Sequence, residues 1–214
     1  HMPSRVAIVG AGPIGCAAAA FLVQDGMAPA MWSPTGSRVQ RQADRARFRC
    51  AGAVSGEVDV EWLASPQRLA EFPVVLLCLP ANAYGDVLGP LNAVWRSGQH
   101  VVVSGALSLA PLWIAGATEG VQVSGWGTTL TTTHFQPDGS LHINPLRSRI
   151  DMATLGPLDL SEALQTCADL FGERFAMADN LLAPTLANIN PIAHAAEVIP
   201  NLTRMESGEA WSLF

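Results

Sequence analysis

The stretch RVAIVGAGPIGCAAAAFLVQDG, residues 5–26, decides the fold. It starts with RVAIV, a short apolar run rich in β-branched residues, which is typical of a buried parallel strand. Glycines in GxGxxG spacing follow at once and open a helix of small residues, which we expect to end near Asp25 and to be closed by Gly26. A second strand is expected at about residues 28–32. The chain therefore begins with a βαβ unit.

The glycine turn indicates where a dinucleotide would bind. In a βαβ unit, glycines at this spacing allow a tight turn and bring backbone N–H groups and a helix N-terminus to a pyrophosphate. A turn that only packs the helix against the strand is the structural alternative. The residues expected to contact a cofactor here are Gly10, Gly12, Pro13, Ile14 and Gly15.

The residues after the second expected strand indicate the type of dinucleotide. An acidic side chain at this place would bind the ribose 2′-hydroxyl of NAD, but WSPTGSRVQRQ is followed by no carboxylate before Asp44. Hydroxyl groups followed by guanidinium groups suit a 2′-phosphate instead. We expect contacts from Ser33, Thr35, Arg38 and Arg41, so NADP(H) is favoured over NAD(H). A solvated arginine-rich loop is the other interpretation.

Strands and helices alternate along the following residues, and this predicts a Rossmann-type, doubly wound, mostly parallel α/β sheet. Cofactors cross the carboxyl edge of such a sheet, so Leu79, Pro80 and Ala81 are expected to border the dinucleotide, and Gly105-Ala106 the nicotinamide. The expected elements are a hairpin within 48–60, strands at 74–79, 100–104 and 121–125, and helices at 82–95 and 107–116.

After Gly125 the pattern becomes antiparallel. The turn-forming cluster Gln136-Pro137-Asp138-Gly139 lies between two threonine-rich or apolar stretches and predicts a hairpin appended to the sheet. An amphipathic helix is expected at 159–171 and a strand at 174–176. A helical pattern interrupted by prolines then runs to about Ile199.

This pattern divides the chain in two. Residues 3–178 are expected to form an NAD(P)-binding domain, and residues 179–214 the start of a helical substrate or dimerisation domain. The chain ends in the apolar sequence GEAWSLF, which has no polar cap. We therefore expect the first part of a longer two-domain protein, or a homodimer or partner that covers this end.

Composition excludes several classes of function. The net charge of −6 argues against a broad nucleic-acid surface, and no apolar run reaches the roughly 18 residues needed to cross a bilayer, so we expect a cytoplasmic protein. The four cysteines lack metal-ligand spacing, so no metal site is expected. All twelve basic residues are arginine, which removes lysine from any catalytic role.

One histidine stands out, in NINPIAHAAEVIPNL at residues 188–202. Asn190 lies one helical turn before His194, so the two side chains can share a face, and an imidazole has a pKa suited to proton transfer near neutral pH. We expect both residues to be catalytic. In contrast, His134 is expected to face solvent from its strand, and His100 to have no catalytic partners.

Three motifs together resemble the octopine/nopaline (opine) dehydrogenase family: Gly10–Gly15, Cys78–Ala81, and Asn190-Pro-Ile-Ala-His194 followed by Asn201 and Glu206. The resemblance covers the whole chain in order. It implies an NAD(P)H-dependent reductive condensation of an amino acid with a 2-keto acid. It also implies that His194 transfers a proton while the nicotinamide delivers hydride, and that Asn190 supports the nicotinamide or the substrate carbonyl.

Two other functions remain open. Ketopantoate reductases share the N-terminal motif, but that family uses a lysine as proton donor and this chain has none. A dinucleotide-binding module or subunit without catalysis is the alternative from a different class, because the fold alone does not determine function.

Overall fold

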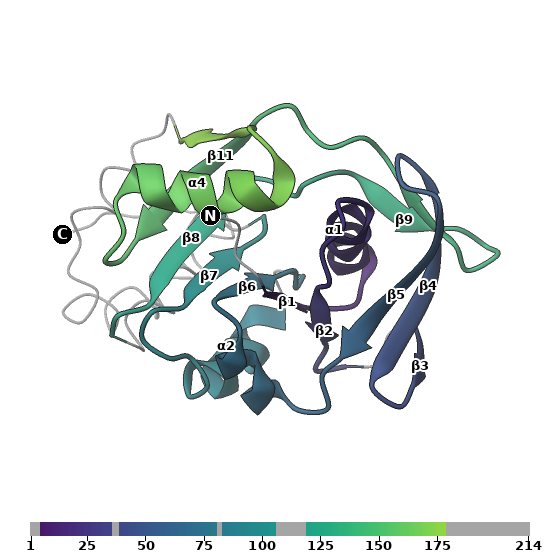
Figure 1. Cartoon of the computed structure of the whole chain (residues 1–214), viewed down its shortest axis with the longest axis horizontal. Coiled ribbons are helices and arrows are strands. Elements are labelled where there is room, and N and C mark those ends of the chain that lie inside the picture. The colour runs from purple at the N-terminus through teal and green to yellow at the C-terminus, as the bar shows by residue number, and fades with distance from the viewer. Residues whose placement is uncertain (1–4, 36–38, 81–82, 106–118, 179–214) are drawn as a thin grey trace.

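The computed structural model describes residues 5–35, 39–80, 83–105 and 119–178. Within these ranges the strands form one twelve-stranded sheet, which is parallel in its centre and has both parallel and antiparallel pairs towards its ends (Figure 1). The expected helices at 107–116 and beyond residue 179, and with them the second domain, lie outside the described residues. The division at residue 178 therefore stays a prediction.

The parallel centre of the sheet confirms the alternation that the sequence predicts. The first strand, β1 (Val6–Val9), lies between β2 and β6, and every adjacent pair in this centre is parallel. All four residues of β1 are buried, as expected for a strand covered on both faces. The other strands of the centre are β2 (Ala30–Trp32), β5 (Gly56–Trp62), β6 (Val74–Leu77), β7 (His100–Val103) and β8 (Gln122–Trp126).

Both expected hairpins are present. The first pairs β4 (Arg45–Gly52) with β5 and is longer than the sequence predicts, and the second pairs β9 (Thr133–Phe135) with β10 (Leu141–Ile143). Because β10 also pairs with β4 in parallel, the second hairpin continues the sheet from the first.

Three short additions complete the sheet. The strand β12 (Phe175–Met177) was expected one residue earlier, whereas β3 (Gln40–Gln42) and β11 (Ile150–Leu155) were not expected. The strand β11 pairs antiparallel with β8 and parallel with β12, and β3 pairs antiparallel with β4.

The helix α1 (Pro13–Gln24) lies inside the curve of the sheet. It contacts β1 and β5 on one side and β9 and β10 on the other (Figure 1). Its residues from Gly15 to Leu22 are all buried, because a helix that is apolar around its whole circumference has to be covered on every side. The expected C-terminal end of this helix is confirmed, since Asp25 caps the helix and Gly26 follows with φ +84°.

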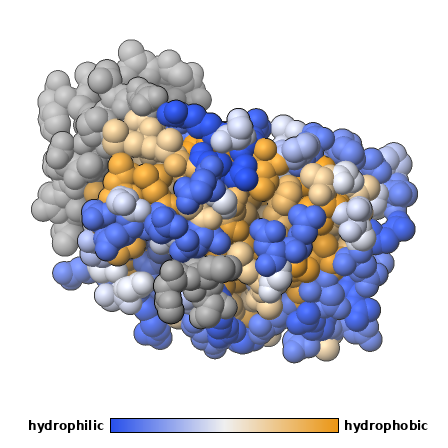
Figure 2. Space-filling view, turned by 45° about the horizontal axis from the view of Figure 1, so that its top comes forward, coloured by the Kyte–Doolittle hydropathy of each residue, from blue (hydrophilic) through white to orange (hydrophobic). Residues whose placement is uncertain are grey.

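Two apolar cores on opposite faces show that the sheet is doubly wound. One core joins α1 to α4 (Leu160–Phe171), and the other lies under α2 (Tyr84–Asn92) and the 3₁₀ helix η1 (Pro66–Glu71). Figure 2 shows hydrophobic residues exposed between hydrophilic ones across the middle of one face. None of the helices in the described ranges is long and apolar enough to span a membrane.

The helix α4 confirms the predicted amphipathic helix and begins with a capping box. The Asp159 side chain accepts a hydrogen bond from the Glu162 amide at 2.8 Å, and the Glu162 carboxylate accepts one from the Asp159 amide at 3.0 Å. The N-terminus of α4 is thus satisfied by its own side chains.

A buried polar network joins the three neighbouring strands β7, β8 and β11. It lies towards the amino ends of the parallel strands, away from the glycine turn. His100 Nε2 lies 2.7 Å from Ser124 Oγ, which in turn lies 2.9 Å from Thr154 Oγ1. Gln122 donates to the same Thr154 oxygen at 2.6 Å. His100 is 4% exposed, and its Nδ1 has no hydrogen-bond partner among the described residues. The sequence analysis did not anticipate this network.

The burial of His100 is expected to make the stability of the protein depend on pH. Burial lowers the pKa of His100 from 6.5 to about 4, so the native imidazole stays neutral while the unfolded chain takes up a proton below pH 6.5. Stability is therefore expected to fall as the pH falls from about 6.5 to 4, by about 3 kcal/mol in total. Urea unfolding of the protein and of His100→Gln across this range measures the effect. The variant should show a flatter profile, the exposed His134→Gln should not, and equal slopes would contradict the assignment.

Candidate functional site

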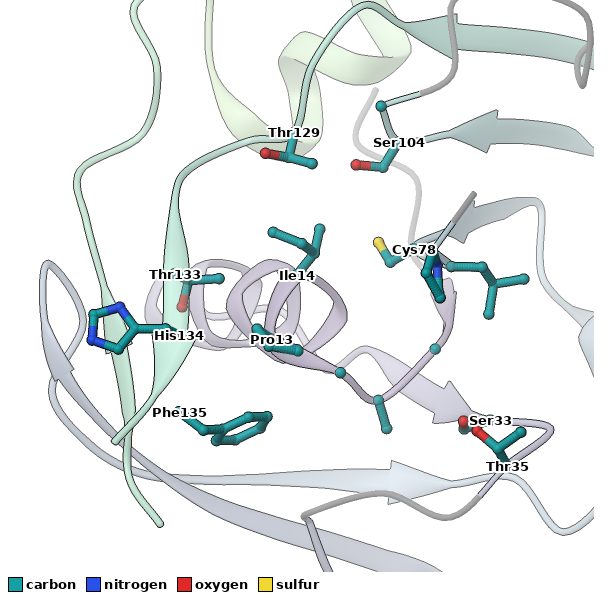
Figure 3. Close-up of a pocket in the computed structure, with 16 residues that line it drawn as sticks. Pro13, Ile14, Ser33, Thr35, Cys78, Ser104, Thr129, Thr133, His134 and Phe135 are labelled. Carbon is teal, nitrogen blue, oxygen red and sulfur yellow. The ribbon is translucent and has the colours of Figure 1, made fainter. Parts of the chain in front are cut away.

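A cavity of about 1010 Å³ opens at the carboxyl edge of the parallel strands (Figure 3). It begins beside the end of β2, passes the glycine turn after β1, and reaches the ends of β6 and β7. It is lined by Gly10, Ala11, Gly12, Pro13, Ile14, Ser33, Thr35, Cys78, Leu79, Pro80, Ser104, Gly105, Thr129, Thr133, His134 and Phe135.

The three glycines of the turn differ in what a side chain at each position would contact. Gly10 has φ +108°, and a Cβ atom there would run into the carbonyl of Cys78. A Cβ atom on Gly15 would collide with the carbonyl oxygen of Gly10. A Cβ atom on Gly12 would meet nothing within 4 Å and would project from a residue that lines the cavity. Packing therefore requires glycine at residues 10 and 15. At residue 12, packing within the protein does not require glycine.

The N-terminus of α1 faces this cavity without a side-chain cap. Gly12 is the N-cap residue, Pro13 follows it, and the first turn holds no acidic residue. At the N-terminus of α4, by contrast, the Asp159 carboxylate caps the first turn. The first amide groups of α1 are thus available to an anionic ligand, which would also benefit from the helix dipole.

Ser33 and Thr35, both expected from the sequence, line the cavity at the end of β2. Arg41 is exposed in β3, and its guanidinium lies over the Trp62 ring, 4.9 Å from the ring centroid. Trp62 pairs with Met31, so Arg41 stands near the end of β2 without lining the cavity. Arg38 lies outside the described residues.

Of the other residues expected to contact the cofactor, some line the cavity and some do not. Leu79 and Pro80 line the cavity after β6, and Gly105 lines it after β7. Gly15 does not line it but packs beneath the turn. Ala81 and Ala106 lie outside the described residues.

The far end of the cavity carries a buried hydroxyl. Ser104, at the end of β7, is 6% exposed, and its Oγ has no hydrogen-bond partner among the described residues. Cys78 directly follows β6, the strand next to β7, and burial raises the pKa of its thiol to about 12. That thiol is therefore neutral at physiological pH and is not an activated nucleophile.

Residues of β9 form a wall that the sequence analysis missed. Thr133, His134 and Phe135 reach the cavity because the second hairpin curves back over the start of α1. The His134 ring points away from the cavity centre in Figure 3 and lies 5.5 Å from the His142 ring. Its side chain is exposed, as expected. The threonine-rich hairpin sequence was the only signal, and it does not reveal the curvature.

All four cysteines are free and buried. In the described part of the chain no group of three or more His, Cys, Asp or Glu side chains could hold a metal ion. The expected catalytic residues His194 and Asn190 lie outside the described residues, so their roles stay predictions.

Sequence comparison finds a distant relative. The chain is 23% identical, over 216 aligned residues, to an opine dehydrogenase from Arthrobacter sp. (strain 1C). The match covers 97% of this chain and 60% of the relative, so the chain spans less than two thirds of that protein. No protein-family model matches.

Comparison of structures finds the same fold in octopine dehydrogenase with NADH and L-arginine (TM-score 0.66, 16% identity, 83% of this chain and 49% of that chain). Yersinopine dehydrogenase with NADP+ bound also has it (TM-score 0.60, 16% identity, 85% and 49%). A ketopantoate reductase from Ralstonia eutropha JMP134 is less similar (TM-score 0.54, 17% identity, 85% and 58%). Sequence and fold thus agree on a distant relationship to the dinucleotide-binding region of opine and octopine dehydrogenases.

Proposed function

We propose that this chain is the dinucleotide-binding part of an NAD(P)H-dependent oxidoreductase of the opine dehydrogenase type, which joins an amino acid to a 2-keto acid by reduction. One observation carries the proposal. The cavity at the carboxyl edge of the sheet brings together a glycine turn, an uncapped helix N-terminus and the hydroxyls of Ser33 and Thr35. This is where open α/β sheets bind dinucleotides.

The cavity suits a ligand that is both extended and anionic. No acidic residue is among the described residues that line it, so a pyrophosphate meets no like charge there. The open space at Gly12 lies beside the first amides of α1, where a phosphate can approach the backbone. At the far end, Ser104 adds a buried hydroxyl that lacks a partner in the ranges that the structure describes.

When bound, a reduced nicotinamide supplies the hydride. The role proposed for this chain is to hold that cofactor along the edge of the sheet and to provide a proton donor. The family resemblance assigns proton transfer to His194 and support of the reacting carbonyl to Asn190. The substrates are inferred from the same resemblance, since octopine dehydrogenase is known with NADH and L-arginine.

One experiment separates this function from the two alternatives. Consumption of reduced nicotinamide is followed with a panel of 2-keto acids, each with and without amino acids. Consumption that needs both substrates supports the opine dehydrogenase type. Consumption with a keto acid alone would favour the ketopantoate reductase type, which has to operate here without a lysine. Dinucleotide binding with no consumption would identify a binding module.

We further propose that the preferred cofactor is NADP(H), with Arg41 as one partner of the 2′-phosphate. Arg41 is exposed, and among the described residues no ion pair occupies it. Its guanidinium stacks on Trp62 beside the end of β2, which orders it without neutralising its charge.

Arg41→Ala is therefore expected to lower NADPH affinity about tenfold, because it removes a charge-assisted hydrogen bond, and to leave NADH affinity unchanged. Fluorescence titration of both nucleotides measures this. Arg47→Ala is a matched control, since Arg47 lies nearby on β4 but binds Asp59 at 2.7 Å. A clear preference of the unaltered protein for NADH would contradict the proposed cofactor.

A further inference from the structure

We propose that Ser104 binds the carboxamide of the nicotinamide and so fixes the orientation of the ring. This inference rests on the proposed dinucleotide function and extends it to the far end of the cavity. It assigns a role to a residue that the glycine motif does not reach.

Ser104 has an unmet capacity for a hydrogen bond. The residue is 6% exposed, yet its Oγ has no partner among the described residues. A buried hydroxyl without a partner is unfavourable, because it has lost its hydrogen bonds to water. Ser104 lines the cavity, so a ligand there can supply the missing hydrogen bond.

Ser104 also lies at a suitable distance from the glycine turn along the edge of the sheet. The glycine turn follows β1, and Ser104 follows β7, which lies two strands away with β6 between them. Neighbouring strands are about 4.8 Å apart, so the two points are separated by roughly 10 Å. A dinucleotide with its pyrophosphate at the turn and its adenosine towards Ser33, on the other side of β1, directs its nicotinamide half to Ser104.

The orientation of the Ser104 hydroxyl supports this placement. Figure 3 shows it pointing into the cavity towards Thr129, with Ile14 below the gap, whereas the Thr129 methyl group faces Ser104 and the Thr129 hydroxyl points away. Thr129 Oγ1 donates its proton to the Thr131 carbonyl at 2.9 Å. The Ser104 hydroxyl has no acceptor among the described residues, so it can donate its proton to the C=O group of a carboxamide.

The neighbouring groups do not compete for this role. The Cys78 thiol is a weak donor and is neutral, because burial raises its pKa to about 12. Gly105 has φ +72°, and a Cβ atom there would lie 3.5 Å from the Thr129 methyl group, so a side chain at this position would stand at the edge of the gap. Among the described residues at this end of the cavity, Ser104 thus offers the hydroxyl that is free to donate.

The test compares two ligands that differ only in the nicotinamide. NADP+ and 2′-phospho-ADP-ribose are titrated by calorimetry into the unaltered protein and into Ser104→Ala, with NAD+ and ADP-ribose in parallel. We expect Ser104→Ala to weaken NADP+ about five- to tenfold, from the loss of one hydrogen bond, and to leave 2′-phospho-ADP-ribose within twofold.

A stability measurement separates this role from a structural one. Because the Ser104 hydroxyl has no partner within the described part of the chain, Ser104→Ala should leave the ligand-free melting temperature unchanged or higher. The control is Ser124→Ala, which removes a buried hydroxyl that does have partners, His100 and Thr154, one strand away. It should lower the melting temperature and weaken neither ligand selectively.

Three results would decide against the inference. Equal weakening of both ligands would place Ser104 beside the ribose or pyrophosphate, and no weakening would remove it from the site. A lower melting temperature in Ser104→Ala without a selective loss of NADP+ would make its role structural. If the unaltered protein binds neither dinucleotide nor the nicotinamide-free fragment, the proposed function itself fails, and this inference fails with it.

Discussion

Replacing His194 with alanine is expected to reduce turnover by about 10²–10⁴-fold, the usual contribution of a positioned general acid, while NADPH affinity changes by less than twofold. An imidazole is suited to this step because its ordinary pKa lies close to neutral pH. The cofactor is expected to bind along the glycine turn and the strand ends, which the substitution does not touch. Steady-state kinetics and nucleotide titration of the intact protein measure the two quantities.

The control for this prediction is another histidine. His142 is half-buried in β10, where it contacts His134 but does not line the cavity, so His142→Ala should retain turnover. His134 is the competing candidate, because it does line the cavity. Unchanged turnover in His194→Ala combined with a large loss in His134→Ala would move the proton donor to β9.

A pair of glycine substitutions should separate binding from folding. Gly12→Ala places a methyl group where the protein leaves open space, and Gly12 has φ −81° and ψ −170°, an extended conformation that alanine also adopts. We expect its stability to change by less than about 1 kcal/mol. Dinucleotide affinity should fall about 100-fold, because the methyl group occupies the approach of the pyrophosphate to the backbone.

Gly15→Ala is the counterpart of this substitution. Its Cβ would collide with the Gly10 carbonyl oxygen, and backbone cannot move aside as a flexible side chain can. We expect a loss of about 2–3 kcal/mol of unfolding free energy, typical of an overpacked core. Chemical denaturation and nucleotide titration of both variants give the comparison. A destabilised Gly12→Ala that keeps its affinity would show that the turn only packs the helix against the strand.

The sequence predicted the parts of the fold that depend on local pattern. The unit from Val6 to Trp32 could be predicted because a buried strand, a glycine turn and a small-residue helix each leave a mark on neighbouring residues. The helix α4 was found from its apolar face, and Asp159 and Glu162 cap its start as their spacing allows.

The missed elements depend on pairing with distant residues. The strand β11 reads IDMATL, which is neither a continuous apolar run nor a strict alternation, and it exists because it pairs with β8 on one side and β12 on the other. Dependence on distant residues also explains which parts of the functional site could not be predicted. The glycine turn is a local motif, whereas the wall at Thr133–Phe135 and the missing partner of Ser104 follow from the curvature and packing of the whole sheet.

The enclosure of α1 has a consequence for the order of folding. This helix is made early in the chain, yet it is covered by β9 and β10, whose last residue is Ile143. Contacts so distant in sequence close slowly, because a long loop has to be ordered before they form. The first βαβ unit therefore emerges from the ribosome with its helix only partly covered. In hydrogen exchange, we expect the amides of α1 to become protected together with those of β10, and not ahead of them.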